Sequence, residues 1–220
     1  MNAETGRYHK EVTIVQAAQP PACGCADIGP FDRPEWFALL ADSRPGAFVA
    51  GTEADGSRTS LALNRVDGRV ESLRNWYAFT WRPAVANGPE GDALLTRLAH
   101  ELRREAPRAT LWPLPDEDES ATRLAHAFRE AGWAVSLDQC DENHVLHVKG
   151  RSFAEYWADR PGRLRTTLKR KAKKVEVEVV EHFDPTLWDH YESIYAESWK
   201  PSEDEPDLLR RFAEAEGAAG

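Results

Sequence analysis

The alternation of apolar and polar residues between positions 47 and 81 predicts an antiparallel meander. Its three strands are Ala47–Thr52, Thr59–Val66 and Arg69–Trp81. Asp55-Gly56 and Asp67-Gly68 separate them, and Asp-Gly between alternating runs is a strong hairpin signal because both turn positions need positive φ. Val12–Val15 adds an edge strand, within an otherwise loose leader over residues 1–30.

Apolar residues at helical spacing predict helices on both sides of the meander. The first helix starts at Asp32 and ends near Ser43, before Pro45. After the loop Asn87–Gly91, the pattern predicts a helix at 92–106, a buried strand at 109–114, a helix that Ser120 caps and Gly132 ends, and strands at 133–137 and 144–148. These elements predict an α/β (α+β) domain over residues 31–150, with a mixed sheet flanked by helices.

A second unit is predicted over residues 151–220. Ser152 and Glu155 form a capping box for a short helix. A helix with a narrow apolar stripe follows; the stripe consists of Leu164, Leu168, Ala172 and Val175. A strand at 175–180 and helices at 186–199 and 205–216 complete the predicted unit.

Composition favours a folded, water-soluble protein. Of 220 residues, 41% are hydrophobic and 10% aromatic, enough to build a core. We expect a cytoplasmic protein with no membrane span, because no apolar run has the necessary length and the N-terminus lacks signal-peptide character. Cys23, Cys25 and Cys140 are too few and too unevenly placed for a disulfide framework or a metal site, so no metal is expected.

Charge is distributed unevenly along the chain. The formal net charge is -9, yet residues 160–174 contain eight basic residues and no acidic one. The other 205 residues carry 20 basic and 37 acidic side chains, a charge of -17. An anionic partner should therefore bind at Arg163, Arg165, Lys169, Arg170 and Lys173. That partner is either the protein's own acidic surface or an external ligand; the acidic remainder and the lack of interleaved aromatics argue against nucleic acid.

The order helix, meander, Gly-containing loop, helix, strand, helix, strand resembles the GNAT acyltransferase fold. In that family a Q/R-x-x-G-x-G/A loop receives the pyrophosphate of acyl-CoA at a helix N-terminus. The matching residues here are Gly88, Gly91 and Ala93. The match is degenerate, because Gly88 replaces the basic or amide residue, Pro89 lacks an N–H, and Glu90 and Asp92 are acidic. A plain strand-to-helix connection is the alternative interpretation.

Residues 163–180 resemble the basic helix and strand that begin a GNAT domain in FemAB-like and CelD-like acyltransferases, and Asn75–Pro83 is similar to an aromatic strand of the CelD-like group. Those proteins carry two GNAT-like domains in tandem, with the acceptor at or near the cleft between them. The resemblance implies N-acyl transfer from acyl-CoA, a cosubstrate rather than a permanently bound cofactor, to an amine-bearing small molecule or sugar.

Acyl transfer needs a base for the amine proton and an acid for the leaving thiolate. The candidates are Tyr77, His144 and His147, each with core packing or surface placement as the alternative role. The alternative function is a catalytically silent GNAT-like module that binds an anionic sugar, nucleotide or protein through residues 160–174.

The second unit ends before any meander of its own, so we expect that this chain alone cannot complete acyl transfer. The apolar side chains of its last helices should then be uncovered; these are Leu187, Tyr191, Ile194, Leu208 and Phe212. The alternative is that these helices pack back on the first unit. The oligomeric state is left open.

Overall fold

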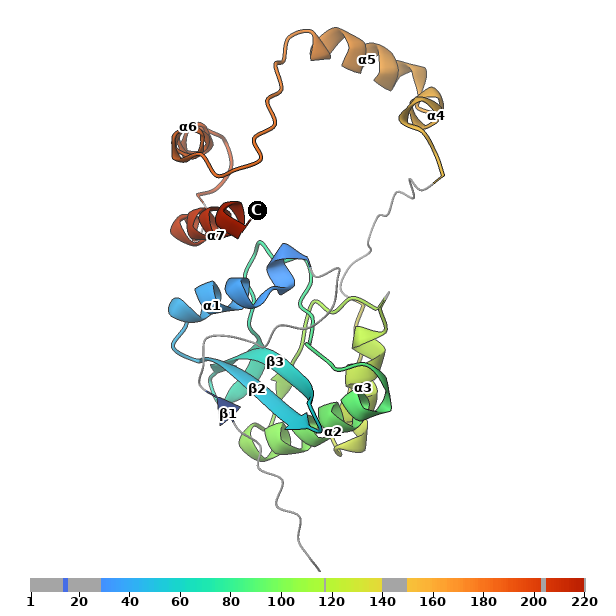
Figure 1. Cartoon of the computed structure of the whole chain (residues 1–220), viewed down its shortest axis with the longest axis vertical. Coiled ribbons are helices and arrows are strands. Elements are labelled where there is room, and N and C mark those ends of the chain that lie inside the picture. The colour runs from blue at the N-terminus through green and yellow to red at the C-terminus, as the bar shows by residue number, and fades with distance from the viewer. Residues whose placement is uncertain (1–13, 16–28, 117, 140–149, 203–204, 220) are drawn as a thin grey trace, which may run out of the picture.

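A computed structural model describes residues 14–15, 29–116, 118–139, 150–202 and 205–219. The protein is a mixed α/β protein whose sheet has the strand order β1-β2-β3-β4-β5. The strands are β1 (Ile14–Val15), β2 (Ala47–Ala54), β3 (Ser57–Val66), β4 (Arg69–Ser72) and β5 (Ala109–Thr110). Figure 1 shows the sheet between α1 (Pro34–Asp42) and α2 (Gly88–Glu105). We call residues 29–139 the body.

The predicted meander is confirmed. Strands β2, β3 and β4 pair antiparallel in sequence order, with Ala50 opposite Leu61 in the first pair. Both Asp-Gly turns have positive φ at both positions, 50° and 80° at residues 55 and 56, and 49° and 76° at residues 67 and 68. Strand β1 pairs antiparallel with β2, as expected of an edge strand.

The prediction that the third strand continues to Trp81 is wrong. Strand β4 ends at Ser72, because the following residues form other hydrogen bonds. The Asn75 Oδ1 atom accepts the Tyr77 N–H at 3.0 Å, which makes a turn. Trp81 is buried, and its indole N–H donates to the Ala62 carbonyl at 2.9 Å. The aromatic run therefore forms a loop over the end of the sheet.

Helix α2 connects β4 to β5, which pair in parallel. It begins at Gly88, four residues before the predicted start, and buries the predicted side chains Leu94, Leu95, Leu98 and Leu102. Strand β5 is shorter than predicted, and residues 133–137 form no strand, although Trp133 and Val135 pack on the core. The strand predicted at 144–148 lies outside the described residues.

Two predicted helix caps are wrong. Ser120 is the first residue of α3 (Ser120–Glu130), and its N–H donates to the Asp118 carboxylate at 3.1 Å. Asp32 ends the 3-10 helix η1 (Pro30–Asp32) and α1 starts after Arg33. The Asp32 carboxylate instead pairs with Arg82 at 3.1 Å, and burial raises its pKa above the ordinary value.

Beyond the body, the predicted capping box of α4 (Phe153–Ala158) is confirmed. The Ser152 N–H and hydroxyl both donate to Glu155, which lowers the pKa of that carboxyl. Helix α5 (Gly162–Ala172) follows. The strand predicted at 175–180 is absent: no strand in the described part of the chain pairs with it, and Val177 and Val179 are 80% and 83% exposed.

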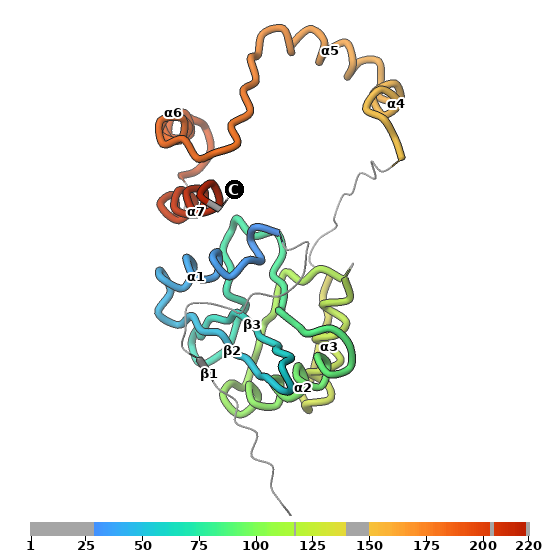
Figure 2. The backbone as a smooth tube through the Cα atoms, in the orientation of Figure 1, coloured from blue at the N-terminus to red at the C-terminus, as the bar shows by residue number. Residues whose placement is uncertain are grey.

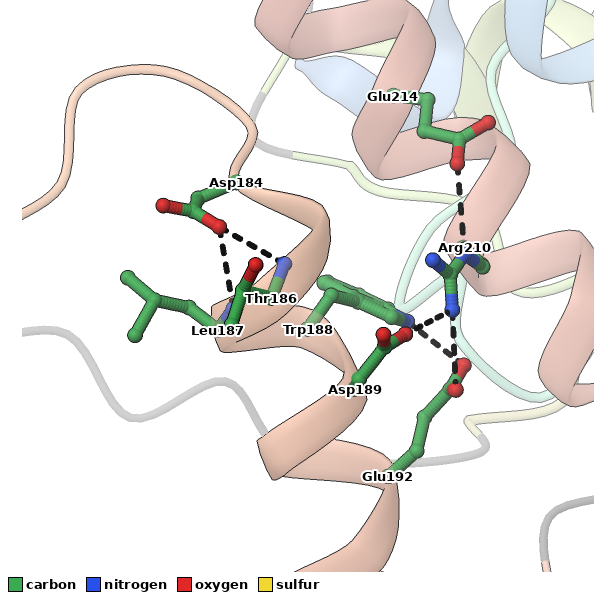
Figure 3. Close-up of polar contacts among 8 residues, drawn as sticks. All are labelled: Asp184, Thr186, Leu187, Trp188, Asp189, Glu192, Arg210 and Glu214. Carbon is green, nitrogen blue, oxygen red and sulfur yellow. Dashed lines mark hydrogen bonds and ion pairs between the residues drawn. The ribbon is translucent and has the colours of Figure 1, made fainter.

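The last two helices are α6 (Pro185–Ala196) and α7 (Pro206–Ala219). The Asp184 side chain caps α6 by accepting the Thr186 and Leu187 N–H groups. Arg210 of α7 donates to Asp189 of α6 at 2.7 Å and to Glu192 at 3.2 Å, and Figure 3 shows its guanidinium with these two carboxylates on one side and Glu214 on the other. These contacts join α7 to α6.

Helix α7 packs on the body beside α1 (Figure 2). The Phe212 ring lies 4.7 Å from that of Trp36 and 5.3 Å from that of Phe31, measured between ring centroids. The expectation of exposure is therefore wrong for Leu208 and Phe212, which are 5% and 6% exposed. It holds for α6, where Ile194 is 71% exposed. The predicted domain boundary at residue 150 stays a prediction.

Candidate functional site

A cavity of about 760 Å³ lies between the loop that follows β4 and the connection from α6 to α7. We call it the Tyr77 cavity. One wall consists of Asn75, Trp76 and Tyr77 from the aromatic run. The opposite wall includes Tyr195, Trp199 and Glu205. The fold thus brings the predicted candidate Tyr77 together with residues that are more than 100 positions away in the sequence.

Glu205 lies at the point where α7 joins the body. Its Oε2 atom accepts from the Arg44 guanidinium at 2.9 Å and from the Asn75 amide at 3.2 Å. Its Oε1 atom has one partner within the described residues, the Ser43 hydroxyl at 3.4 Å, whose single proton also faces the Leu40 carbonyl at 3.1 Å. Asn75 is 7% exposed and also accepts the Tyr77 N–H, so it positions both residues. The carboxylate is fixed, with one oxygen weakly bonded.

Aromatic rings line both walls of the cavity. Trp76 and Trp199 are 83% and 91% exposed, although Trp is highly buried on average. Tyr195 donates its hydroxyl to the Pro201 carbonyl at 3.2 Å, which holds the turn between α6 and α7. A cavity with apolar faces and a few convergent polar groups is the usual form of a small-molecule site.

Sequence reasoning missed Arg44 and Glu205. Glu205 precedes Pro206 in an acidic run, and a carboxylate before a helix start predicts only a favourable dipole contact. Its contact with Arg44 spans 161 positions. His144 and His147 lie outside the described residues, so their predicted roles stay predictions.

The predicted pyrophosphate residues lie in the first two turns of α2. Glu90 accepts from the Ser57 hydroxyl at 3.2 Å, and Asp92 pairs with Arg123 at 2.8 Å. Gly91 approaches the backbone so closely that a Cβ atom would lie 1.8 Å from the Ala86 carbonyl oxygen. Backbone packing is thus sufficient reason for this glycine, and two carboxylates flank the place that a phosphate would occupy.

The predicted anion-binding residues lie on α5 or directly after it, and all of them are exposed; they are Arg163, Arg165, Lys169, Arg170 and, after the helix, Lys173. None of them forms an ion pair within the described part of the chain. An internal acidic surface was one of the two predicted partners. Within the described part of the chain, no such surface neutralises these five cations.

Comparison with protein-family models, with curated proteins and with solved structures finds no match for this chain. Among the described residues, no group of three or more His, Cys, Asp or Glu side chains is arranged to hold a metal ion. The helices of this described part are all too short or too polar to cross a bilayer. The three cysteines lie outside the described residues.

Proposed function

We propose that the protein is a GNAT-like N-acyltransferase and that the Tyr77 cavity binds the amine acceptor. The observation that carries this proposal is that Tyr77 and the fixed Glu205 carboxylate both line one aromatic-rich cavity, where Tyr77 also packs against the hydrophobic core. The element order supports it in part: α1, the meander, α2, β5 and α3 follow one another as the resemblance implies, but the strand expected after α3 at 133–137 does not form. Of the features that resemble the FemAB-like and CelD-like groups, the basic helix is present as α5, whereas residues 75–83 and 175–180 form no strand.

The proposed chemistry assigns one proton-transfer step to each of two residues. The amine nitrogen attacks the thioester carbonyl, and the Glu205 carboxylate accepts the amine proton at Oε1, the oxygen with the weaker hydrogen bond. The C–N bond forms as the C–S bond breaks. Tyr77 donates its phenolic proton to the leaving thiolate and recovers a proton from solvent, and Glu205 releases the amine proton to solvent. Asn75 and Arg44 act as positioning residues for Glu205.

The donor in this proposal is acyl-CoA. The resemblance assigns its pyrophosphate to Gly88, Gly91 and Ala93, but Glu90 and Asp92 lie among these residues. Their negative charges repel phosphate, and Pro89 offers no N–H, so this turn alone should bind the donor weakly. Calorimetry with a panel of acyl-CoAs on the full-length protein measures this directly.

The test of the proposal is thiol release from acetyl-CoA by the full-length protein, supplied in turn with a panel of primary amines. Tyr77→Phe and Glu205→Gln should each lower kcat/KM by about 100-fold or more, because each removes a proton-transfer group. Phe79→Ala is the matched control. Phe79 is 87% exposed in the same loop and lies outside the cavity lining, so this variant should retain activity.

Glu205→Gln also weakens the contact between α7 and the body, so a second control is needed. Arg211→Gln removes an ion pair to Asp42 that joins α7 to the body outside the cavity. Loss of activity in Glu205→Gln but not in Arg211→Gln supports a chemical role. Absence of thiol release with every amine, or full activity in Tyr77→Phe and Glu205→Gln, overturns the proposal.

A second function, anion binding without catalysis, is favoured by the cations of α5, which form no ion pair with the residues that the structure describes. Eight basic residues within 15 positions repel one another, and no acidic residue lies among them. Binding of polyphosphate that weakens steeply with salt would support this function.

A further inference from the structure

The α4–α5 arm, residues 151–175, exposes apolar and cationic side chains together. Phe153 is 72% exposed and Val175 64%, while Leu164 and Leu168 are 47% and 48% exposed. The hydrogen bonds, ion pairs and ring contacts that the structure shows for this arm all lie within it. A partner could therefore bind the arm without having to displace it from the body.

Helical geometry places cations on both edges of the apolar stripe of α5. Leu164, Leu168 and Ala172 recur every four residues and share one face. At 100° per residue, Arg165 flanks this face on one side and Lys171 flanks it on the other. Long basic side chains can bury their stems beside such a stripe while their charges reach outward to anionic groups.

Helix α4 widens the apolar surface. Its Phe153 and Trp157 rings stack, with centroids 5.9 Å apart and an interplanar angle of 12°. Together with Leu168 and Ala172 they line a groove of about 550 Å³, and Arg165 and Lys169 line the same groove. A soluble polyanion would neutralise the cations but leave these apolar groups in water. A surface with both hydrocarbon and negative charge would satisfy both.

We propose that the α4–α5 arm binds the surface of anionic phospholipid bilayers, with its apolar face in the headgroup region. An amphipathic helix rich in Lys and Arg, with aromatic and aliphatic residues on the other face, is the form that interfacial helices take. The proposal deepens the anion-binding function by naming its ligand, and it rests on that function. It does not depend on acyl transfer in the Tyr77 cavity.

The test is flotation of the whole 220-residue chain with phosphatidylcholine vesicles that either contain or lack phosphatidylglycerol. The chain should float only with the anionic vesicles, and binding should fall with added salt. Replacing Lys169, Arg170 and Lys173 by Gln should weaken binding about 100-fold. The matched control replaces Arg58, Arg108 and Arg129 by Gln. These three body cations are also exposed and form no ion pair in the described part, and their loss should change binding far less.

A second variant tests the apolar part of the proposal. Leu164→Ser with Leu168→Ser leaves every charge in place and should weaken vesicle binding about tenfold or more. Polyphosphate binding, measured by calorimetry, should stay unchanged in this variant. Far-UV circular dichroism of vesicle-free samples checks that all variants keep the helix content of the parent.

Three outcomes overturn the lipid proposal. If the chain binds polyphosphate but not anionic vesicles, the anion-binding function holds and its ligand is a soluble polyanion. If the serine variant floats like the parent, the apolar face does not contact the bilayer. If neither vesicles nor polyphosphate bind, the lipid proposal and the anion-binding function both fail, whereas acyl transfer is still judged by thiol release.

Discussion

Helices α5 and α7 are both amphipathic, but only α7 packs on the body. Helix α7 contributes Phe212, which contacts the rings of Trp36 and Phe31. It also has charge partners on the body: Arg33 pairs with Glu216, Arg44 with Glu205, and Arg211 with Asp42. Helix α5 has smaller apolar side chains, and its cations have no carboxylate partner in the described part of the chain.

The difference between α5 and α7 teaches that a helical apolar stripe does not specify its own partner. A large aromatic side chain buries more area than a Leu side chain, and the fit of its ring to a site on the body adds specificity. In the ion pairs that join α7 to the body, the cation belongs to the body in some pairs and to α7 in another. A helix whose face carries cations alone needs a partner that is anionic throughout. The following predictions test this comparison, from the largest expected effect to the smallest.

Native-state proteolysis should show the largest difference. Trypsin should cleave between Lys169 and Lys174 at least about 100-fold faster than at Arg210 or Arg211, because cleavage in α7 first requires its release from the body. Mass spectrometry of early digestion products measures the two rates. Equal rates at α5 and α7 would mean that α7 is not held on the body in solution.

Removing the aromatic anchor of α7 should destabilise the protein. Phe212→Ala should lower the free energy of unfolding by about 3 kcal/mol, because it removes a buried ring and leaves a cavity beside Trp36. Leu168→Ala in α5 is the control, with an expected change below about 1 kcal/mol since that side chain is half exposed. Urea titration followed by circular dichroism measures both. Similar losses in the two variants would contradict the comparison.

Two ion pairs between α7 and the body should differ in their contribution. The side chains of Arg44 and Glu205 are 22% and 25% exposed, and Arg44→Gln should cost about 1–2 kcal/mol. Those of Arg211 and Asp42 are 50% and 55% exposed, and Arg211→Gln should cost less than about 0.5 kcal/mol. Urea midpoints of the two variants give the difference. A larger loss of stability from Arg211→Gln would show that the less exposed pair, Arg44 with Glu205, does not anchor the helix.

The smallest effect concerns Asp32, next to the Phe31 ring that Phe212 contacts. Burial raises the pKa of this carboxyl, so the folded state binds its proton more tightly than the unfolded state does. Its contribution to stability is therefore present at low pH and is lost as pH rises from the ordinary value of 3.8 through the folded pKa.

The measurement compares urea midpoints of the parent and of Asp32→Asn across this acidic range. The parent should lose stability relative to Asp32→Asn as pH rises, because only the parent must ionise a buried carboxyl. A parent that gains stability relative to the variant would show that the pairing with Arg82 outweighs burial.

Part of the candidate site could be predicted from sequence. Tyr77 was predicted as a candidate on the third meander strand, and Asn75 belongs to the same aromatic run, but the structure places both in the loop after β4. Glu205 and Arg44 could not be predicted, because their pairing depends on where α7 packs. A sequence pattern describes which face of a helix is apolar, but contacts between distant segments depend on the shapes of both surfaces.

The sequence by itself determined the elements that depend on neighbouring residues. The Asp-Gly turns, the Leu-rich face of α2 and the capping box at Ser152 follow from local backbone and side-chain chemistry, and the structure contains all three. Tertiary structure alone decided the end of β4, the absence of a strand at 175–180 and the place of α7. Each of these depends on a partner distant in sequence: a strand forms only where another strand accepts its hydrogen bonds, and an apolar face is buried only where a complementary surface meets it.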